Sequence, residues 1–327
     1  MADLYHTLTK YTEENVRGGP GLDFSRQPRQ FKEIVSQHRV SLRAHVPVKI
    51  TEKGALVELP SASAPPEPLG IASLSRLLFF TNGVTGLIRH SGGGQFLRAA
   101  PSAGALYPTE VYVAVRDVQG LDPGLYNYQV PTHELVRLWD GDQLGEIERA
   151  CGGDDAFRKA RACLVLTAVY WRSAWRYRER GYRRVLLDSG HVLANLLAYA
   201  PVERVAARTH FGFLDADVNG LFFFDDSVEA ALACVTLGEG TPAGPAPLWP
   251  SPAADPAHPD PADLLEEGQL ATSATVRLHR ASSCAGGIPP HGGDDGAAGV
   301  TDRSIPLEAP GNLVARVPEA LLRRRSA

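Results

Sequence analysis

The segment from Arg98 to Pro108 holds the residues whose types and spacing best suit binding of a flat polar ligand. Its sequence is Arg-Ala-Ala-Pro-Ser-Ala-Gly-Ala-Leu-Tyr-Pro, and it lies between the glycine-rich stretch 91–94 and an apolar run at 110–115. Prolines fix φ, and small residues leave backbone N–H groups accessible. The segment can therefore lay its main chain against a planar ring, although an ordinary turn that leads into a strand has a similar composition.

A second group of candidates lies on a helix that we predict from Arg183 to about Ala200. This stretch is apolar almost all round, which is typical of a buried helix. Asp188, His191 and Asn195 nevertheless form a narrow polar stripe along it at helical spacing. A solvent-exposed face would explain the stripe. Polar groups on a buried helix need partners, however, so we favour a hydrogen-bonded network at a dimer interface.

The 98–108 segment resembles the signature of the SagB-type dehydrogenases, FMN enzymes of the nitroreductase superfamily, some of which oxidise azolines to azoles. Other segments resemble the same family in the same order along the chain: Tyr5–Tyr11, Leu22–Lys32, Gly124–Leu135 and Arg180–Asn195. The resemblance implies an α+β, nitroreductase-like fold with a mostly antiparallel central sheet surrounded by helices. It also implies that FMN is bound where two subunits meet.

The resemblance places FMN against the loop that follows Arg98. The predicted ring contacts are Pro101, Ser102, Ala103 and Gly104. Arg98 is a candidate for the phosphate or for the O2 edge of the ring, where reduced flavin gathers charge; a surface salt bridge is the alternative. Lys10 is a second phosphate candidate on a polar N-terminal segment, and Asn195 is assigned to the cofactor as well.

The resemblance also suggests a catalytic pair. Azoline oxidation removes a hydride from one carbon and a proton from its neighbour, so a base must take the proton. Azole-forming members of the family carry an adjacent Lys-Tyr pair, and the aligned pair here is Arg176-Tyr177. Arginine stays protonated and accepts a proton poorly. Tyr177 with His191 or a water could relay the proton, and Arg176 could orient an acidic substrate; a salt-bridged surface helix is the structural alternative.

Composition excludes several function classes. The chain has 327 residues and a net charge of −4, so it offers no broad basic surface for nucleic acid. The chain has four cysteines, and no two of them form a Cys-x-x-Cys pair. This spacing argues against a zinc or other structural metal site and against a disulfide framework. Cys163 and Cys234 lie in apolar runs, as expected for buried thiols. We find no secretory signal and no apolar stretch of about 18 residues for a membrane span. We therefore expect a cytoplasmic protein.

Apolar periodicity predicts the elements that position these residues. A helix is predicted over 73–80, with Ser73 as its cap and Asn82-Gly83 at its end. A further helical pattern covers 142–152. Strands are predicted over 111–115, 125–130, 134–139, 163–171 and 231–237. The run 163–171 is apolar throughout, which is typical of a central strand covered on both faces.

The chain divides into segments by composition. Residues 1–70 are predicted to form an N-terminal arm, and residues 71–238 the nitroreductase-like FMN domain. Residues 239–300 are rich in proline and glycine, as a linker would be. Residues 301–327 end in three consecutive arginines and a serine. They resemble the start of a second, truncated nitroreductase-like domain, although a plain basic tail has the same charge pattern.

Together these features predict an FMN-dependent oxidoreductase that acts on azoline-type or other small or peptide-derived heterocycles in natural-product biosynthesis. Its partners would be a small-molecule or modified-peptide substrate and a second nitroreductase-like chain, in a homodimer or a heterodimer. Two alternatives stay open. The chain could be the non-catalytic half of a split tandem that completes a partner's flavin site, or an NAD(P)H-dependent nitroreductase.

Overall fold

The central sheet organises the protein. A computed structural model describes residues 2–13, 21–46, 48–51, 54–57, 68–90, 93–239 and 273–283. The sheet has seven strands in the order β1-β8-β7-β6-β9-β11-β10, and every neighbouring pair is antiparallel. The strands are β1 (Arg39–Ser41), β6 (Thr109–Val115), β7 (Gly124–Gln129), β8 (Glu134–Asp140), β9 (Ala160–Val169), β10 (Ala206–His210) and β11 (Glu229–Gly238).

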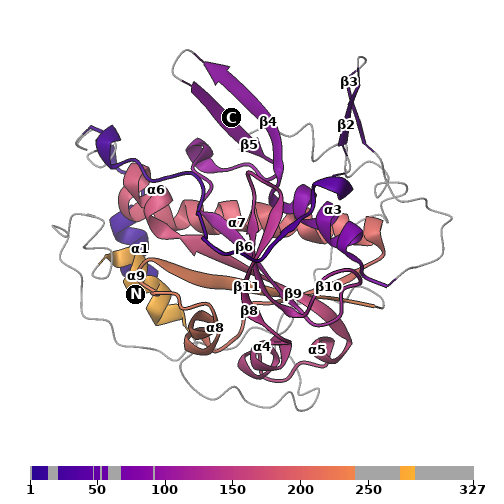
Figure 1. The fold of residues 1–327 in the computed structure, drawn as a ribbon. Helices are drawn as coiled ribbons and strands as arrows, with labels where there is room; N and C mark the ends of the chain where they lie inside the picture. Colours follow the sequence, from indigo (N-terminus) through magenta and orange to yellow (C-terminus); the bar gives the residue numbers. More distant parts are fainter. Residues whose placement is uncertain are drawn as a thin grey trace, which may run out of the picture.

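Helices cover both faces of this sheet, as Figure 1 shows. On one face lie α3 (Ile71–Asn82) and α7 (Gly181–Tyr199); on the other lie α4 (Leu144–Ala150), α5 (Ala156–Lys159) and α8 (Asp215–Leu221). A third apolar cluster joins α1 (Ala2–Thr9), α6 (Tyr170–Tyr177) and α9 (Ala274–Ser282). The predicted α+β fold, with a mostly antiparallel central sheet surrounded by helices, is confirmed.

Two hairpins extend from this body (Figure 1). They are β2 (Val48–Thr51) with β3 (Gly54–Val57), and β4 (Val84–His90) with β5 (Gly93–Arg98). The β4–β5 hairpin leads directly into the predicted cofactor loop. Its position therefore sets where that loop begins.

Strand alternation explains why the central strands lack a polar face. Val111 and Val113 of β6 join the cluster under α3 and α7, while Tyr112 and Ala114 join the cluster under α4 and α8. Because both faces are covered, all of β6 and nearly all of β9 are buried. The prediction of a doubly covered central strand is thus confirmed for β9. Its predicted last residues, 170–171, instead begin α6.

The thiols lie in this core as predicted. Cys163 and Cys234 are buried in the α4–α8 cluster together with Cys151. Burial raises the pKa of the Cys163 thiol well above its usual value. Cys284 lies outside the described residues.

Helix α3 begins earlier than predicted. Its N-cap is Gly70, and the Ile71 N–H donates to the Gln119 carbonyl at 2.9 Å, so Ser73 lies inside the helix and does not cap it. The predicted end is correct. The Gly83 N–H donates to the Phe79 carbonyl, and a Cβ on Gly83 would lie 2.6 Å from that oxygen.

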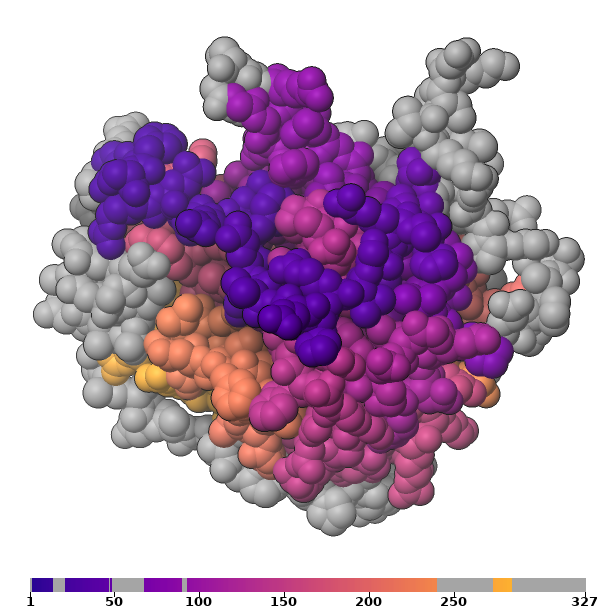
Figure 2. Space-filling model, viewed as in Figure 1, coloured from indigo at the N-terminus to yellow at the C-terminus, as the bar shows by residue number. Residues whose placement is uncertain are grey.

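The N-terminal segment is an integral part of the fold, and Figure 2 shows its indigo residues lying across the front of the molecule. Strand β1 pairs with β8, and the Leu42 N–H donates to the His133 carbonyl at 3.0 Å. The Ser75 hydroxyl donates to the Leu42 carbonyl at 3.0 Å. The His133 ring lies between Ser75 Oγ (2.8 Å) and the Tyr128 hydroxyl (2.7 Å). This buried set of bonds fastens the arm to α3 and to the β7–β8 turn.

The predicted linker 239–300 overlaps two described parts of the chain, residue 239 and residues 273–283. The second part contains α9, and the Ala274 and Thr275 N–H groups donate to the Glu179 carboxylate at 3.0 and 2.9 Å. Residues 301–327, the predicted start of a second domain, lie outside the described residues.

One helical run passes a length and composition test for a membrane span. Residues Tyr170–Glu203 include a window with a mean hydropathy of 1.3, and 44% of that window is buried inside the protein. The run is broken between α6 and α7, which pack on each other and on the core. Core helices of water-soluble proteins pass the same test.

His133 gives the fold a pH dependence. Burial lowers the pKa of His133 to about 4, from 6.5 in a free histidine. Below pH 6.5 this histidine is protonated in the unfolded chain, whereas in the folded protein it stays neutral until about pH 4. The free energy of unfolding should therefore fall as the pH falls through this window. The full loss should be on the order of 3 kcal/mol. Chemical denaturation at pH 7 and pH 4.5 measures it.

The matched variant is His133→Asn, because asparagine tolerates the left-handed conformation of this residue (φ 53°). It should be less stable than the wild type at pH 7 and should lose less stability on acidification. Burial also lowers the pKa of His279 to about 4, so His279 contributes the same pH dependence of stability in both proteins. An identical pH dependence in the two proteins would contradict this role for His133.

Candidate functional site

The predicted cofactor loop has an unusual backbone. Gly104, Ala105 and Tyr107 all have positive φ, at 64°, 52° and 48°. Residues with a side chain seldom adopt this conformation, so contacts with the rest of the fold must impose it. The loop connects β5 to β6 and includes the short 3-10 helix η3 (Ala103–Ala105).

Asp188 of α7 holds this loop in place. Its carboxylate accepts the Ser102 hydroxyl at 2.6 Å and the Ala103 N–H at 3.1 Å, and Ser102 Oγ in turn accepts the Tyr107 N–H at 2.8 Å. The Asp188 residue is only 6% exposed. Burial raises the pKa of the Asp188 carboxyl, and the bonds from Ser102 and Ala103 oppose that shift.

The polar stripe on α7 has partners within its own chain. Asp188 binds the loop of its own chain, and the Asn195 amide donates to the Thr81 carbonyl at 3.3 Å. His191 is exposed, and its Nδ1 donates to the Leu187 carbonyl at 2.8 Å. The stripe is polar because a buried helix must bind a loop and a neighbouring helix, a contact that sequence periodicity does not reveal.

The loop meets the predicted catalytic pair. A Cβ on Gly104 would lie 2.9 Å from the Tyr177 hydroxyl oxygen and 3.4 Å from Arg176 Cδ. Arg176 and Tyr177 are the last two residues of α6, which follows directly from the central strand β9. The fold thus brings together two predicted groups that are far apart in the sequence.

Gly104 and Arg176 border a pocket of about 390 Å³, a size typical of small-molecule sites. The described lining residues are Phe24, Gln27, Pro28, Gln30, Gly94, Gln95, Gly104, Ala105, Leu106, Trp175 and Arg176. One wall is the loop, another is the N-terminal segment 24–30, and Trp175 adds an aromatic surface. Among the described lining residues Arg176 is the cationic one.

Arg98 supports this pocket from inside the protein. It is 2% exposed, and its guanidinium donates to the carbonyls of Gln30 (2.9 Å) and Thr109 (3.3 Å). The guanidinium carbon lies about 5 Å from the ring centres of Phe31 and Tyr107. Burial lowers the pKa of Arg98 to about 10. The structure therefore places this predicted cofactor residue behind the pocket wall.

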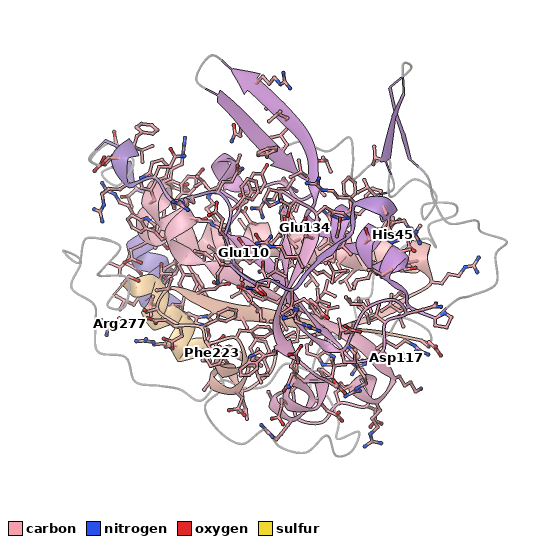
Figure 3. All side chains as sticks on the ribbon, viewed as in Figure 1. His45, Glu110, Asp117, Glu134, Phe223 and Arg277 are labelled. Carbon is pink, nitrogen blue, oxygen red and sulfur yellow. The ribbon has the colours of Figure 1, made fainter. Side chains whose placement is uncertain are left out.

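A second buried arginine works beside it. Arg172 pairs at 2.5 Å with Glu110, which Figure 3 labels, and both residues are buried. Arg172 also donates to the carbonyls of Arg29 (3.2 Å) and Tyr107 (3.1 Å). Both buried arginines thus tie the N-terminal segment to the start of β6. Sequence reasoning missed Arg172 and the 24–30 wall because these contacts join distant parts of the chain.

The other predicted site residues lie apart from the described pocket lining. Lys10 follows α1, and its carbonyl accepts Arg180 Nη2 at 3.2 Å. Pro101, Ser102 and Ala103 precede Gly104 in the loop and do not belong to the described pocket lining. Sequence reasoning did not identify Trp175 as a pocket residue. Its position directly before the Arg176-Tyr177 pair could have indicated this role. Its indole N–H donates to the Asp23 carbonyl at 2.9 Å.

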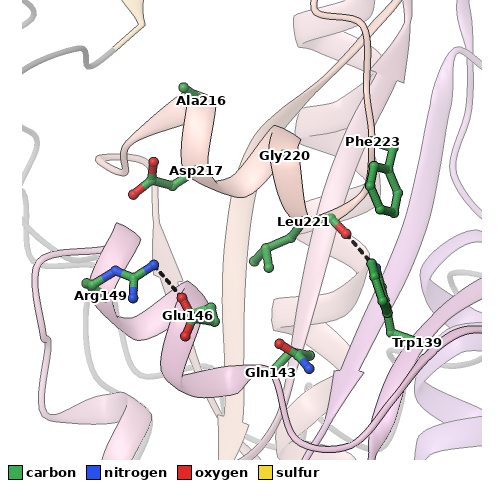
Figure 4. Close-up of a pocket in the computed structure, with 9 residues that line it drawn as sticks. All are labelled: Trp139, Gln143, Glu146, Arg149, Ala216, Asp217, Gly220, Leu221 and Phe223. Atoms are coloured by element: carbon green, nitrogen blue, oxygen red, sulfur yellow. Dashed lines mark hydrogen bonds and ion pairs between the residues drawn. The ribbon is translucent and has the colours of Figure 1, made fainter.

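A separate pocket of about 410 Å³ lies between α4 and α8, and Figure 4 shows its lining. Phe223 stacks on Trp139 with ring centres 5.4 Å apart, and the Trp139 indole N–H donates to the Leu221 carbonyl at 3.0 Å. Glu146 and Arg149 form an ion pair at its rim. This pocket includes none of the predicted site residues.

Comparison with known proteins identifies the fold family. The sequence model described as "Nitroreductase family" matches residues 72–239. The chain belongs to the nitroreductase family. It is 36% identical to MJ1384 of Methanocaldococcus jannaschii, a protein named as a nitroreductase, over 152 residues that make up 46% of this chain and 73% of that protein.

Two further relatives are named as processing proteins of trifolitoxin and of microcin B17. The trifolitoxin-processing protein TfxB of Rhizobium leguminosarum bv. trifolii is 29% identical over 62% of this chain and 57% of its own length. The microcin B17-processing protein McbC of Escherichia coli is 26% identical over 45% of this chain and 56% of its own. The chain thus spans little more than half of either relative. The predicted membership of the SagB-type branch of the superfamily is confirmed.

A solved structure agrees with the fold. The crystal structure of a nitroreductase from Anabaena variabilis superposes with a TM-score of 0.68 at 32% identity, covering 88% of this chain and 55% of that one. This nitroreductase-family chain matches only 55% of the Anabaena protein, a share similar to those of TfxB and McbC.

The pocket suits FMN in three respects. Gly104 leaves the loop wall without a side chain, so a ring can approach the main chain closely. Glutamine amides at 27, 30 and 95 offer donors and acceptors to a polar ring edge, and Trp175 offers a flat apolar surface. Arg176 offers positive charge to an anionic group of the cofactor or of its substrate. The described residues therefore fit the cofactor that the family resemblance implies.

The Asp188 contact can be tested by stability. Asp188→Ala removes the acceptor that the carboxylate supplies to the Ser102 hydroxyl and the Ala103 N–H, so we expect a loss of about 3 kcal/mol in the free energy of unfolding. Asp188→Asn should cost less, because the amide oxygen still accepts the Ala103 N–H. Urea denaturation measures both. The exposed Asp217→Ala serves as control and should cost no more than about 1 kcal/mol; equal losses for the two alanine variants would refute the anchoring role.

Proposed function

We propose that this nitroreductase-family protein is an FMN-dependent oxidoreductase. Its substrates would be azoline-type rings or other small or peptide-derived heterocycles in natural-product biosynthesis. The observation that supports this most is the position of Tyr177 beside Gly104 and Arg176, two residues that line a pocket of ligand size. The toxin-processing names of TfxB and McbC support a peptide-derived substrate.

In this proposal the pocket binds both cofactor and substrate. FMN, when bound, supplies a hydride acceptor. The 101–104 loop would lie against the flavin, and Arg98 would act indirectly by fixing the 24–30 wall through the Gln30 carbonyl. Asn195 and Lys10 would act, if at all, through the elements that they fasten, since neither belongs to the described pocket lining.

Tyr177 is the residue we propose for the proton. Its hydroxyl lies beside the loop, and arginine, the residue type of the neighbouring position 176, is a poor proton acceptor. We propose Arg176 for orienting an anionic substrate or cofactor group. His191 lies on the exposed side of α7, where a second chain or a water could connect it to the site.

The exposed face of α7 supports a dimer. Leu186, Leu187 and Leu197 on this face are 48%, 56% and 38% exposed, which is costly for large apolar residues on a helix. A homodimer, or a heterodimer with another nitroreductase-like chain, would bury them. We propose the cytoplasm as its location, because three described cysteines are free.

One other function has specific support. Arg176 replaces the family's lysine, and this favours a chain that completes a partner's flavin site without reacting itself. Protein that stays colourless with added FMN, yet increases flavin binding by a second nitroreductase-like chain, would establish that role. Rapid bleaching of bound flavin by NADH or NADPH would instead indicate a nicotinamide-dependent nitroreductase.

The cofactor proposal makes a direct prediction. Purified protein titrated with FMN should bind one equivalent per chain or per dimer, as measured by visible absorbance after gel filtration. Gly104→Val should weaken FMN binding at least about tenfold, because its branched side chain would meet the Tyr177 hydroxyl and enter the ring's space. Gly141→Val is the matched control, since Gly141 also has positive φ (83°) but open space around it. Equal FMN affinity in the two variants would contradict the placement.

The catalytic assignment predicts a separable effect. Tyr177→Phe should slow flavin reduction by a phenyl-substituted thiazoline about 100-fold or more, while FMN content stays unchanged. Arg176→Lys should accelerate the same step, because lysine can give up its proton where arginine cannot. Anaerobic stopped-flow bleaching of the flavin measures both, with Tyr126→Phe as control. An unaltered rate in Tyr177→Phe would remove this residue from the reaction.

A further inference from the structure

Arginines cluster where α6 ends and α7 begins. Positions 176, 178, 180, 183 and 184 are all arginine. Two of them have a clear structural purpose. Arg180 donates to the Thr9 and Lys10 carbonyls, and Arg183 donates to the Thr9 hydroxyl, so both bind the C-terminal end of α1. That helix end carries partial negative charge, which these arginines neutralise.

Arg176 and Arg184 have no such partner. Their guanidinium carbons lie 5.9 and 5.5 Å from the centre of the same ring, that of Tyr177. Arg184 also donates to the Tyr11 hydroxyl at 2.9 Å. Within the described residues neither arginine forms an ion pair with a carboxylate. Two cations therefore converge on the residue that we propose for proton transfer.

The carboxylates nearby are already bound elsewhere. Asp188 holds Ser102 and Ala103, and Glu179 binds the first N–H groups of α9. The first turn of α7 also lacks an acidic residue, although the N-terminal end of a 19-residue helix favours negative charge. The Arg184 charge acts through space on the Asp188 carboxyl, but both oxygens of that carboxylate are occupied by Ser102 and Ala103. Among the described residues, the two guanidinium groups beside Tyr177 are therefore left without a carboxylate in direct contact.

We propose that Arg176 and Arg184 bind a carboxylate of the substrate at the mouth of the pocket. The planar fork of arginine matches the two oxygens of a carboxylate, and in peptide-derived substrates an acidic side chain or a free C-terminus supplies that group. Substrate specificity would thus favour an acidic group next to the ring that is oxidised. This inference rests on the proposed function, because it places the substrate at Tyr177.

The test compares matched probes on the FMN-loaded protein. One pair is a phenyl-substituted thiazoline carboxylate and its carboxamide; a second pair, benzoate and benzamide, has no azoline ring. Isothermal titration calorimetry should show that the wild type binds the carboxylate of each pair at least about tenfold more tightly, the equivalent of one charge-assisted hydrogen bond. Added salt should reduce this preference.

Arg184→Gln should lose most of the carboxylate preference without changing carboxamide affinity or FMN content. Arg183→Gln is the control, because it removes the same charge from the same helix turn but binds α1. Equal affinity for both members of each pair in the wild type would overturn the inference. So would a preference that survives in Arg184→Gln while FMN is lost, since the arginine would then serve the cofactor phosphate.

The outcomes also separate this inference from the proposed function. If both carboxylates are preferred but the thiazoline never reduces the flavin, the anion site stands and azoline oxidation fails. If the thiazoline reduces the flavin but carboxylate and carboxamide bind equally, the function stands and the anion site fails.

Discussion

The bond between Asp188 and the 102–103 loop is the constraint on which the site depends. A loop with three left-handed residues would not hold its shape alone. The carboxylate accepts the Ser102 hydroxyl and the Ala103 N–H from the middle of a helix that is itself packed on the sheet. Through Ser102 Oγ the same contact fixes the Tyr107 N–H. Gly104 is thereby held against Tyr177.

Buried arginines extend this constraint to the N-terminal segment. The guanidinium groups of Arg98 and Arg172 donate hydrogen bonds to the backbone carbonyls of residues 29, 30, 107 and 109. An unpaired buried charge would be costly, and the Glu110–Arg172 pair with these carbonyl bonds offsets that cost. The pocket wall at 24–30 is thus fastened to charged groups in the core beneath it. Arg176 and Arg184, in contrast, are the arginines that we propose for binding an anionic group of the substrate.

The sequence predicted elements better than contacts. β6, β7, β8, β9 and β11 lie where alternation and apolar runs place them, since both faces of the sheet are covered and the core excludes polar residues. The first residue of α3 was predicted wrongly. A β-bridge between Gly70 and Gln119, and not a cap at Ser73, determines where this helix begins. The partners of Asp188 and Asn195 inside the chain, Ser102 and Thr81, were missed for a similar reason, because they are remote in sequence.

By itself, the sequence determined the nitroreductase-type architecture, the identity of the 98–108 loop and the Arg176-Tyr177 pair, because each is carried by residue types in a short stretch. Only the tertiary structure decided that Gly104 touches Tyr177, that Arg98 lies behind the wall, and that Arg184 joins Arg176 beside one ring. These are contacts between segments that the sheet and α7 bring together. Local propensity and spacing contain no information on such distances, since packing across the whole core sets them.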